Sequence, residues 1–128
     1  METQEIVKEL NNIKELMTQE KFAEAIVLIE KLKEKDKASD FDYTHTHQLY
    51  HLDSNARSLY NQQIILKRIK EISLNQNSIT FQYLNKLLKS YNELNLSEDI
   101  LRREIEILIL RNQLKCKLDG ETINFTSL

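Results

Sequence analysis

The expected fold of the C-terminal part of this chain is decided by the stretch Leu114-Lys115-Cys116-Lys117-Leu118-Asp119-Gly120-Glu121-Thr122-Ile123-Asn124-Phe125. Apolar and polar residues alternate on both sides of Asp119-Gly120, which is typical of strands with one buried face. Asp-Gly between two such runs predicts a β-hairpin, because a type I′ turn needs positive φ at both central residues. Pairing outward from this turn gives one face with Cys116 opposite Ile123 and Leu114 opposite Phe125, and another face with Lys115, Lys117, Thr122 and Asn124.

A capped helix is predicted directly before this hairpin, over residues 98–112. Ser97 is a residue type that caps helix N-termini, and Glu98 and Asp99 place negative charge where it stabilises the helix dipole. Farther upstream, the sequence predicts a helix from about Asp53 or Ser54 to Leu74. A short strand at 78–80 and a helix over 81–89, with Thr80 as a candidate cap, are expected to follow. Helix, short strand, helix, helix and hairpin, in this order, is the topology of a winged helix.

Two amphipathic helices are predicted before that domain, over residues 3–17 and 18–35, because apolar residues recur there at helical spacing. Their junction is short, so they should fold back as an antiparallel hairpin, with Thr18 capping the second helix. The run Phe22-Ala23-Glu24-Ala25-Ile26 is similar to the second half of a tetratricopeptide-type unit. Residues 36–45 are polar and lack periodicity, and are expected to form a loop.

These patterns predict a mainly α fold with two domains. Residues 1–52 would form a tetratricopeptide-like helical hairpin plus loop, and residues 53–128 a winged helix that ends in a β-hairpin. The winged half carries surplus apolar positions, which we expect to be covered by the hairpin or by a hairpin exchanged with a second chain: Tyr60, Ile64, Ile107 and Leu110.

Composition bounds the cellular setting of the chain. Among 128 residues there is no proline, one glycine and one cysteine, so an intramolecular disulfide is excluded. No apolar run approaches the length of a membrane span, and the N-terminus lacks the layout of a signal peptide. We therefore expect a cytoplasmic or nuclear protein that does not associate with membranes.

Two segments resemble the C-terminal module of PCI-domain proteins, which are subunits of the proteasome lid, the signalosome and the large eukaryotic translation initiation factor. The segments are Ile79-Thr80-Phe81-x-x-Leu84-x-x-Leu87 and Glu104-Ile105-Glu106-x-Leu108-Ile109-x-x-x-Gln113-Leu114-Lys115-Cys116-Lys117-Leu118-Asp119. The resemblance covers residues 53–128, and the helical pair before them matches the helical-repeat region of that family. Here Asn112-Gln113 replaces the family's usual glycine before the wing, and the helical region is much shorter.

The C-terminal winged helix of cullins is a comparable match in pattern. The segment from Ile64 to Ile72, however, does not reproduce the stretch that precedes the modified lysine of cullins. Both resemblances imply a subunit of a larger protein assembly.

The sequence therefore predicts a non-enzymatic protein–protein interaction module, a small subunit or adaptor of an intracellular complex that is also able to self-associate. No glycine-rich phosphate loop is present, because the single glycine is used by the hairpin. Neither catalytic residues nor a cofactor site is predicted. The candidate partner-binding residues are an apolar centre, Ile107 and Leu110, with rim contacts from Arg102, Arg103, Lys115 and Lys117.

The alternative is a nucleic-acid-binding winged helix, such as a transcription or replication factor. Residues 54–91 hold six basic residues and one acidic residue, whereas residues 1–53 hold seven basic and twelve acidic residues. The basic segment would present a face for phosphates, unless it pairs with the acidic helices of the same chain. The candidate nucleic-acid face is Arg57, Lys67, Arg68, Lys70, Lys86 and Lys89.

Three histidines, His45, His47 and His51, lie close together in the sequence. If their segment is helical, His47 and His51 are one turn apart, a spacing that can chelate a metal ion. Zinc, however, prefers four nitrogen or sulfur ligands, and nothing fixes the remaining ligands. We therefore interpret the cluster as chance in a polar loop and predict no metal site.

Overall fold

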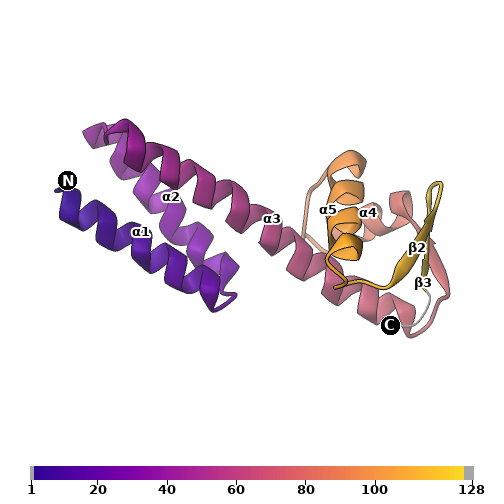
Figure 1. The fold of residues 1–128 in the computed structure, drawn as a ribbon. Helices are drawn as coiled ribbons and strands as arrows, with labels where there is room; N and C mark the ends of the chain where they lie inside the picture. Colours follow the sequence, from indigo (N-terminus) through magenta and orange to yellow (C-terminus); the bar gives the residue numbers. More distant parts are fainter. Residues whose placement is uncertain (1, 126–128) are drawn as a thin grey trace. The chain divides into compact units, whose positions relative to one another are not determined.

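Helices dominate the computed structural model, which describes residues 2–125 (Figure 1). A small antiparallel sheet lies near the C-terminus, so the expected mainly α fold with a C-terminal β-hairpin is confirmed. The chain divides into two units between Tyr60 and Asn61. The boundary expected after residue 52 lies inside a long helix, α3. The described elements are α1 (Thr3–Thr18), α2 (Phe22–Ser39), α3 (Tyr43–Ser73), β1 (Ser78–Thr80), α4 (Phe81–Ser90), α5 (Glu98–Leu110), β2 (Cys116–Asp119) and β3 (Thr122–Phe125).

The first unit contains α1, α2 and the beginning of α3. Helix α2 runs back along α1, as expected for an antiparallel hairpin (Figure 1). Each helix contributes one apolar stripe to a common core, because apolar residues at three- and four-residue spacing share a helix face. The core residues are Ile6, Leu10, Ile13, Ala25, Ile29, Leu32, Phe41, Leu49, Leu52 and Ala56.

Two predicted helix starts are wrong. Helix α3 begins at Tyr43 instead of Asp53, and α2 ends at Ser39 instead of Lys35. Only residues 40–42 of the predicted loop 36–45 therefore lie outside a helix. Asp42 caps α3, since its carboxylate accepts a hydrogen bond from the backbone N–H of His45. Helix α2 begins at Phe22, and Thr18 is the last residue of α1. The Thr18 hydroxyl donates to the carbonyl of Lys14, and so does not cap α2.

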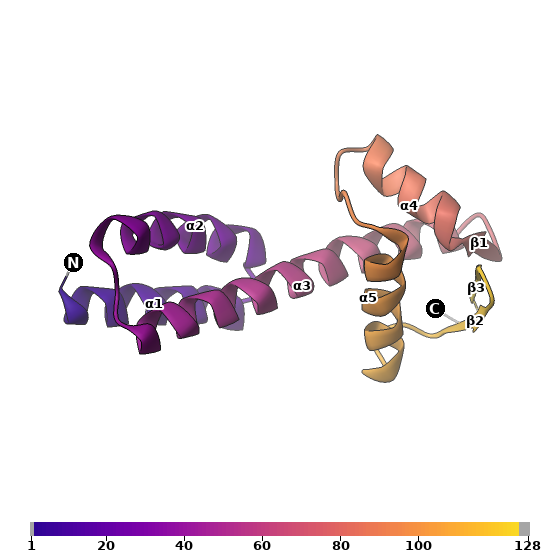
Figure 2. The same ribbon diagram turned by 90° about the horizontal axis from the view of Figure 1, so that it is seen from above.

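The second unit contains the remainder of α3 and all later elements, which can be followed in Figure 2. Strand β1 forms where a first short strand was expected, and β3 pairs with both β1 and β2. Both predicted caps are confirmed: Thr80 accepts a hydrogen bond from the N–H of Tyr83, and Ser97 from that of Ile100. The buried apolar residues of this unit are Ile65, Ile69, Ile79, Phe81, Leu84, Leu88, Leu94, Leu101, Ile105, Leu108, Leu114 and Ile123.

The predicted register of the C-terminal hairpin is wrong by two residues. Cys116 pairs with Phe125 and not with Ile123, which is opposite Leu118. The turn is consequently centred on Gly120-Glu121, and Gly120 has a φ of +60°. Glycine at the first central position is what a type II′ turn requires, whereas Asp119-Gly120 had been expected to form a type I′ turn. A shift of two preserves the alternation of faces, so Lys117, Thr122 and Asn124 still share a side.

Four helices are followed by a left-handed residue that is not glycine: Glu20, Asp40, Asn92 and Asn112, with φ of 61°, 53°, 55° and 59°. The N–H after Asp40 donates to the side chain of Asp36. After Glu20, Asn92 and Asn112, the following N–H bonds back to a carbonyl of the last turn, as Gln113 does to Leu108. This is the Schellman helix end, in which glycine is commonest and asparagine is the usual substitute. Asn112 therefore adopts the left-handed conformation that a glycine at this position before β2 would adopt.

The four surplus apolar positions differ in exposure. Within the first unit, the α1–α2 hairpin packs on Leu49, Leu52 and Ala56 of α3. In the second unit, the side chain of Leu110 is 81% exposed. Tyr60, Ile64 and Ile107 are half-buried. Among residues 2–125, no helix combines the length and the hydrophobicity that crossing a bilayer requires.

Candidate interaction surfaces

The outward face of α5 carries an apolar stripe. Leu101, Glu104, Ile105 and Leu108 are buried, so the opposite side of the helix faces solvent. We call the residues Ile100, Arg103, Ile107 and Leu110 on that side the α5 outer stripe. Ile100 is 37% exposed, Leu110 is 81% exposed, and Ile107 is half-buried. Apolar side chains at three- and seven-residue spacing on an exposed helix face are what a partner helix or groove binds.

Arg102 lies beside that stripe, but its side chain contacts other residues of the second unit. Its guanidinium donates to the carbonyl of Gly120 and to the carboxylate of Glu121, both at 3.1 Å. It also lies over the ring of Phe81, 4.1 Å from the ring centre. Arg102 therefore ties α5 to the hairpin turn. Arg103, with a side chain 63% exposed, is the arginine that faces outward.

Lys115 and Lys117 lie at the other candidate surface, the edge of the sheet. The strand order is β1-β3-β2, so β2 has one edge without a strand partner among residues 2–125. Lys117 is an exposed residue of β2, and Lys115 precedes that strand. Lysines on an edge strand hinder random pairing with other chains, although an edge can still accept a specific strand.

The six residues of the candidate nucleic-acid face are divided between the two units. Arg57 belongs to the first unit, where it pairs with Asp53 and Glu30. Arg68 pairs with Glu71 and Glu93 and lies 4.6 Å from the centre of the Tyr91 ring. The four exposed lysines make no ion pair with any residue of 2–125: Lys67, Lys70, Lys86 and Lys89.

Of these lysines, Lys86 and Lys89 line one surface depression together with Gln82, Ser90, Ser97 and Glu98. The negative charge of the Glu98 carboxylate would repel a phosphate that entered this depression. The segment is thus partly neutralised by the chain's own carboxylates. The pair of Arg57 with Glu30 of α2 agrees with the alternative that the segment pairs with the acidic helices of the same chain.

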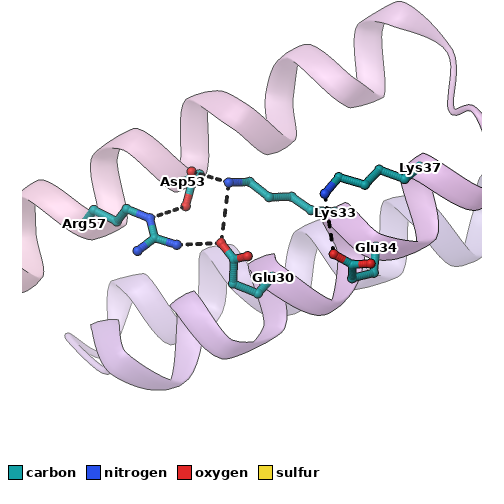
Figure 3. Close-up of polar contacts among 6 residues, drawn as sticks. All are labelled: Glu30, Lys33, Glu34, Lys37, Asp53 and Arg57. Carbon is teal, nitrogen blue, oxygen red and sulfur yellow. Dashed lines mark hydrogen bonds and ion pairs between the residues drawn. The ribbon is translucent and has the colours of Figure 1, made fainter.

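A charged network between α2 and α3 was missed by sequence reasoning (Figure 3). Lys33 donates to Asp53 at 2.6 Å, and Arg57 donates to the same carboxylate at 2.8 Å. The Lys33 and Asp53 side chains are only 16% and 13% exposed. Burial raises the pKa of Asp53, but the hydrogen bonds from Lys33 and Arg57 outweigh it and hold that pKa below its usual range.

This network stabilises the first unit. Burial lowers the pKa of Lys33, but the neighbouring carboxylates of Asp53 and Glu30 outweigh that effect and raise it above its usual value. Lys33 also lies 4.9 Å from the centre of the Tyr50 ring. Every charge in the network therefore has a partner, which is what a structural ion-pair cluster requires.

The structure gives each histidine a different environment. His47 and His51 are exposed on α3, and the His47 ring stacks on Tyr43 with ring centres 5.8 Å apart. His45 is half-buried, with its Nδ1 3.1 Å from the Asp42 carboxylate. No group of three or more metal-ligating side chains occurs within residues 2–125.

Of the predicted partner-binding residues, the structure brings Arg103, Ile107 and Leu110 together on the α5 outer stripe. Ile100 was missed, although its seven-residue spacing to Ile107 was a usable signal. Comparisons of the chain with protein-family models, with curated proteins and with solved structures found no match. The function of the chain is therefore inferred from its own residues.

Proposed function

We propose that the chain is a non-enzymatic protein–protein interaction module, a small subunit or adaptor of a larger complex in the cytoplasm or nucleus. Its second unit would be a winged helix similar to the C-terminal module of PCI-domain proteins. The order of α3, β1, α4, α5, β2 and β3, with β3 between the other two strands, supports this comparison. The single observation that carries the proposal is the exposed apolar stripe of α5.

The chemistry of this stripe favours a protein partner. Leu110 exposes most of its side chain to water. A binding partner that covers this side chain would remove its apolar surface from water, which is favourable. Arginine beside apolar residues is a combination enriched at the energetic centres of protein interfaces. The same outward side of α5 carries Asp99 and Glu106, whose carboxylates would repel phosphate.

Affinity capture with two matched leucine variants tests this function. Leu74 and Leu110 are exposed to the same extent, 82% and 81%, so their replacement by serine changes the surface equally. Bait chains carrying Leu110→Ser, Leu74→Ser or neither change are compared in the same lysate. The proposal expects a protein that is bound by the wild-type and Leu74→Ser chains and lost from Leu110→Ser. A set of bound proteins that is identical for all three baits would refute it.

Nucleic-acid binding is a second candidate function, favoured by four lysines that have no ion-pair partner among residues 2–125: Lys67, Lys70, Lys86 and Lys89. Duplex binding through them should weaken steeply with salt, with a log–log slope of about −0.9 per phosphate contacted. The double variant Lys86→Gln, Lys89→Gln should lose about two phosphate contacts, and its salt dependence should become less steep accordingly. The matched control is Lys31→Gln with Lys35→Gln, two exposed lysines of α2. A flat salt dependence would remove this second candidate.

A further inference from the structure

We propose that His47 and His51 form a two-ligand site for a divalent late transition-metal ion, such as Ni²⁺, Cu²⁺ or Zn²⁺, on the exposed face of α3. Nothing in the proposed function requires this site. It follows from the finding that α3 begins at Tyr43, which places both histidines inside a helix.

The helical geometry brings the two imidazoles to one face. Residues four apart in an α-helix are neighbours on its surface, and two histidines at this spacing are a known zinc-binding arrangement. Leu49, Leu52 and Ala56 turn toward the core, and His47 and His51 lie on the opposite, exposed side of the helix. Both side chains are therefore open to an ion from solvent.

The ring nitrogens of both residues are available. Neither imidazole makes a hydrogen bond or an ion pair with any residue of 2–125. The stacking of His47 on Tyr43 engages the face of the imidazole, whereas a metal ion binds a nitrogen lone pair in the ring plane. No lysine or arginine occurs in residues 43–56, so no cation on that stretch of helix repels a metal ion.

The ligand type determines which ions fit. Imidazole nitrogen suits Zn²⁺, Cu²⁺ and Ni²⁺, whereas Mg²⁺ and Ca²⁺ prefer oxygen ligands. Two protein ligands leave the other coordination positions to water, so the site holds its ion exchangeably. Affinity should follow the general order for divalent ions, in which Cu²⁺ binds more tightly than Ni²⁺ or Zn²⁺.

The chain offers a matched control in His45. This residue lies two positions before His47, on the side of the helix that is half-buried, with its Nδ1 beside Asp42. A chelate with His51 would require His45 to lie on the exposed face. His45→Ala therefore removes a histidine without removing a ligand.

Isothermal titration of the full chain, prepared without a polyhistidine tag, tests the site with NiCl₂, CuCl₂ and MgCl₂. The expected result is one Ni²⁺ or Cu²⁺ per chain, tighter binding of Cu²⁺, and no binding of Mg²⁺. His47→Ala and His51→Ala should each weaken Ni²⁺ binding by at least about tenfold. Replacing a residue that only hydrogen-bonds to a metal ligand already lowers metal affinity by about this factor. His45→Ala should leave the affinity unchanged, and circular dichroism should show the same helix content for all variants.

Either of two results with the variants would overturn the proposal. One is Ni²⁺ binding that His47→Ala or His51→Ala leaves unchanged, and the other is an equal loss in His45→Ala. Absence of measurable Cu²⁺ binding by the wild-type chain would also overturn it.

Discussion

The guanidinium group of Arg102 lies 4.1 Å from the centre of the Phe81 ring and covers one face of it. Phe81 is buried at the start of α4, and its backbone N–H donates to the carbonyl of Glu121 in the hairpin turn. Arg102 bonds to Gly120 and Glu121 of the same turn. One arginine of α5 therefore holds the position of the turn against the first residue of α4.

Replacing Arg102 by alanine should reduce the free energy of unfolding by about 1–2 kcal/mol, because a charge-assisted hydrogen bond and a cation–π contact are lost together. Glu121 is mostly exposed, so its ion pair adds little to this figure. Arg111→Ala, at an exposed arginine at the C-terminal end of α5 that has no ion pair among residues 2–125, is the matched control and should change stability by less than about 0.5 kcal/mol. Urea denaturation of both variants measures the difference. Equal effects would show that Arg102 does not hold the turn.

The hairpin turn illustrates what the sequence could predict and what it could not. Alternation and the Asp-Gly pair correctly predicted two strands and their two faces. The register depends on which two residues occupy the centre of the turn, and both Asp119-Gly120 and Gly120-Glu121 are compatible with glycine at 120. The contacts of Arg102 and Phe81 with the turn are tertiary and leave no local pattern in the sequence.

The start of α3 was missed for a related reason. Residues 43–51 contain threonines and histidines, which have modest helix propensity, and few apolar residues. The usable signals were Asp42 as a cap and the helical spacing of Leu49, Leu52 and Ala56. In contrast, Thr80 and Ser97 were recognised because each directly precedes a clear amphipathic run. The α5 outer stripe was partly predicted, since it follows from helical spacing once the buried side of α5 is known.

The observed register predicts different costs for two neighbouring substitutions. Gly120 has a φ of +60°, and a Cβ there would meet no atom within 4 Å. Gly120→Ala should therefore cost about 1–2 kcal/mol from backbone strain alone. Asp119 lies outside the central pair, so Asp119→Ala should cost less than about 0.5 kcal/mol. Chemical denaturation of the two variants measures both costs. If Asp119→Ala destabilised the protein as much as Gly120→Ala does, the turn would be centred on Asp119-Gly120 and the observed register would be contradicted.

Glu20 occupies a left-handed conformation that suits glycine better. Removing the side chain relieves about 1–2 kcal/mol of strain, offset by about 0.5–1 kcal/mol from the greater freedom of glycine in the unfolded chain. Glu20→Gly should thus stabilise the protein by about 0.5–1 kcal/mol. Glu15→Gly, inside α1, is the control and should destabilise it by about 1 kcal/mol. A loss of stability in Glu20→Gly, measured by thermal denaturation, would contradict this account.

The Lys33–Asp53 pair predicts a pH-dependent contribution to stability. Because the pKa of Asp53 is lower in the folded protein, its contribution is fully present above about pH 4 and is lost as the pH falls through the folded-state pKa. Asp53→Asn should cost about 2 kcal/mol at pH 7, and its difference from the wild type should shrink below about pH 3.

The exposed pair of Glu34 and Lys37, drawn beside this network in Figure 3, provides the control. Glu34→Gln should change stability by less than about 0.5 kcal/mol at pH 7. Denaturation midpoints recorded from pH 7 to pH 2.5 compare the two variants. A deficit of Asp53→Asn that is independent of pH would show that the carboxylate charge is not what stabilises the pair.

The central claim, that the α5 outer stripe binds a protein, is tested most directly by photocrosslinking from single positions. A photoreactive amino acid replaces Leu110 in one chain and Leu74, equally exposed, in another. Both chains are irradiated in the same lysate, and the crosslinked products are identified by mass spectrometry. The account predicts one recurrent protein adduct from position 110 that Leu74 does not give and that excess wild-type chain suppresses. No adduct from position 110, or the same adducts from both positions, would contradict it.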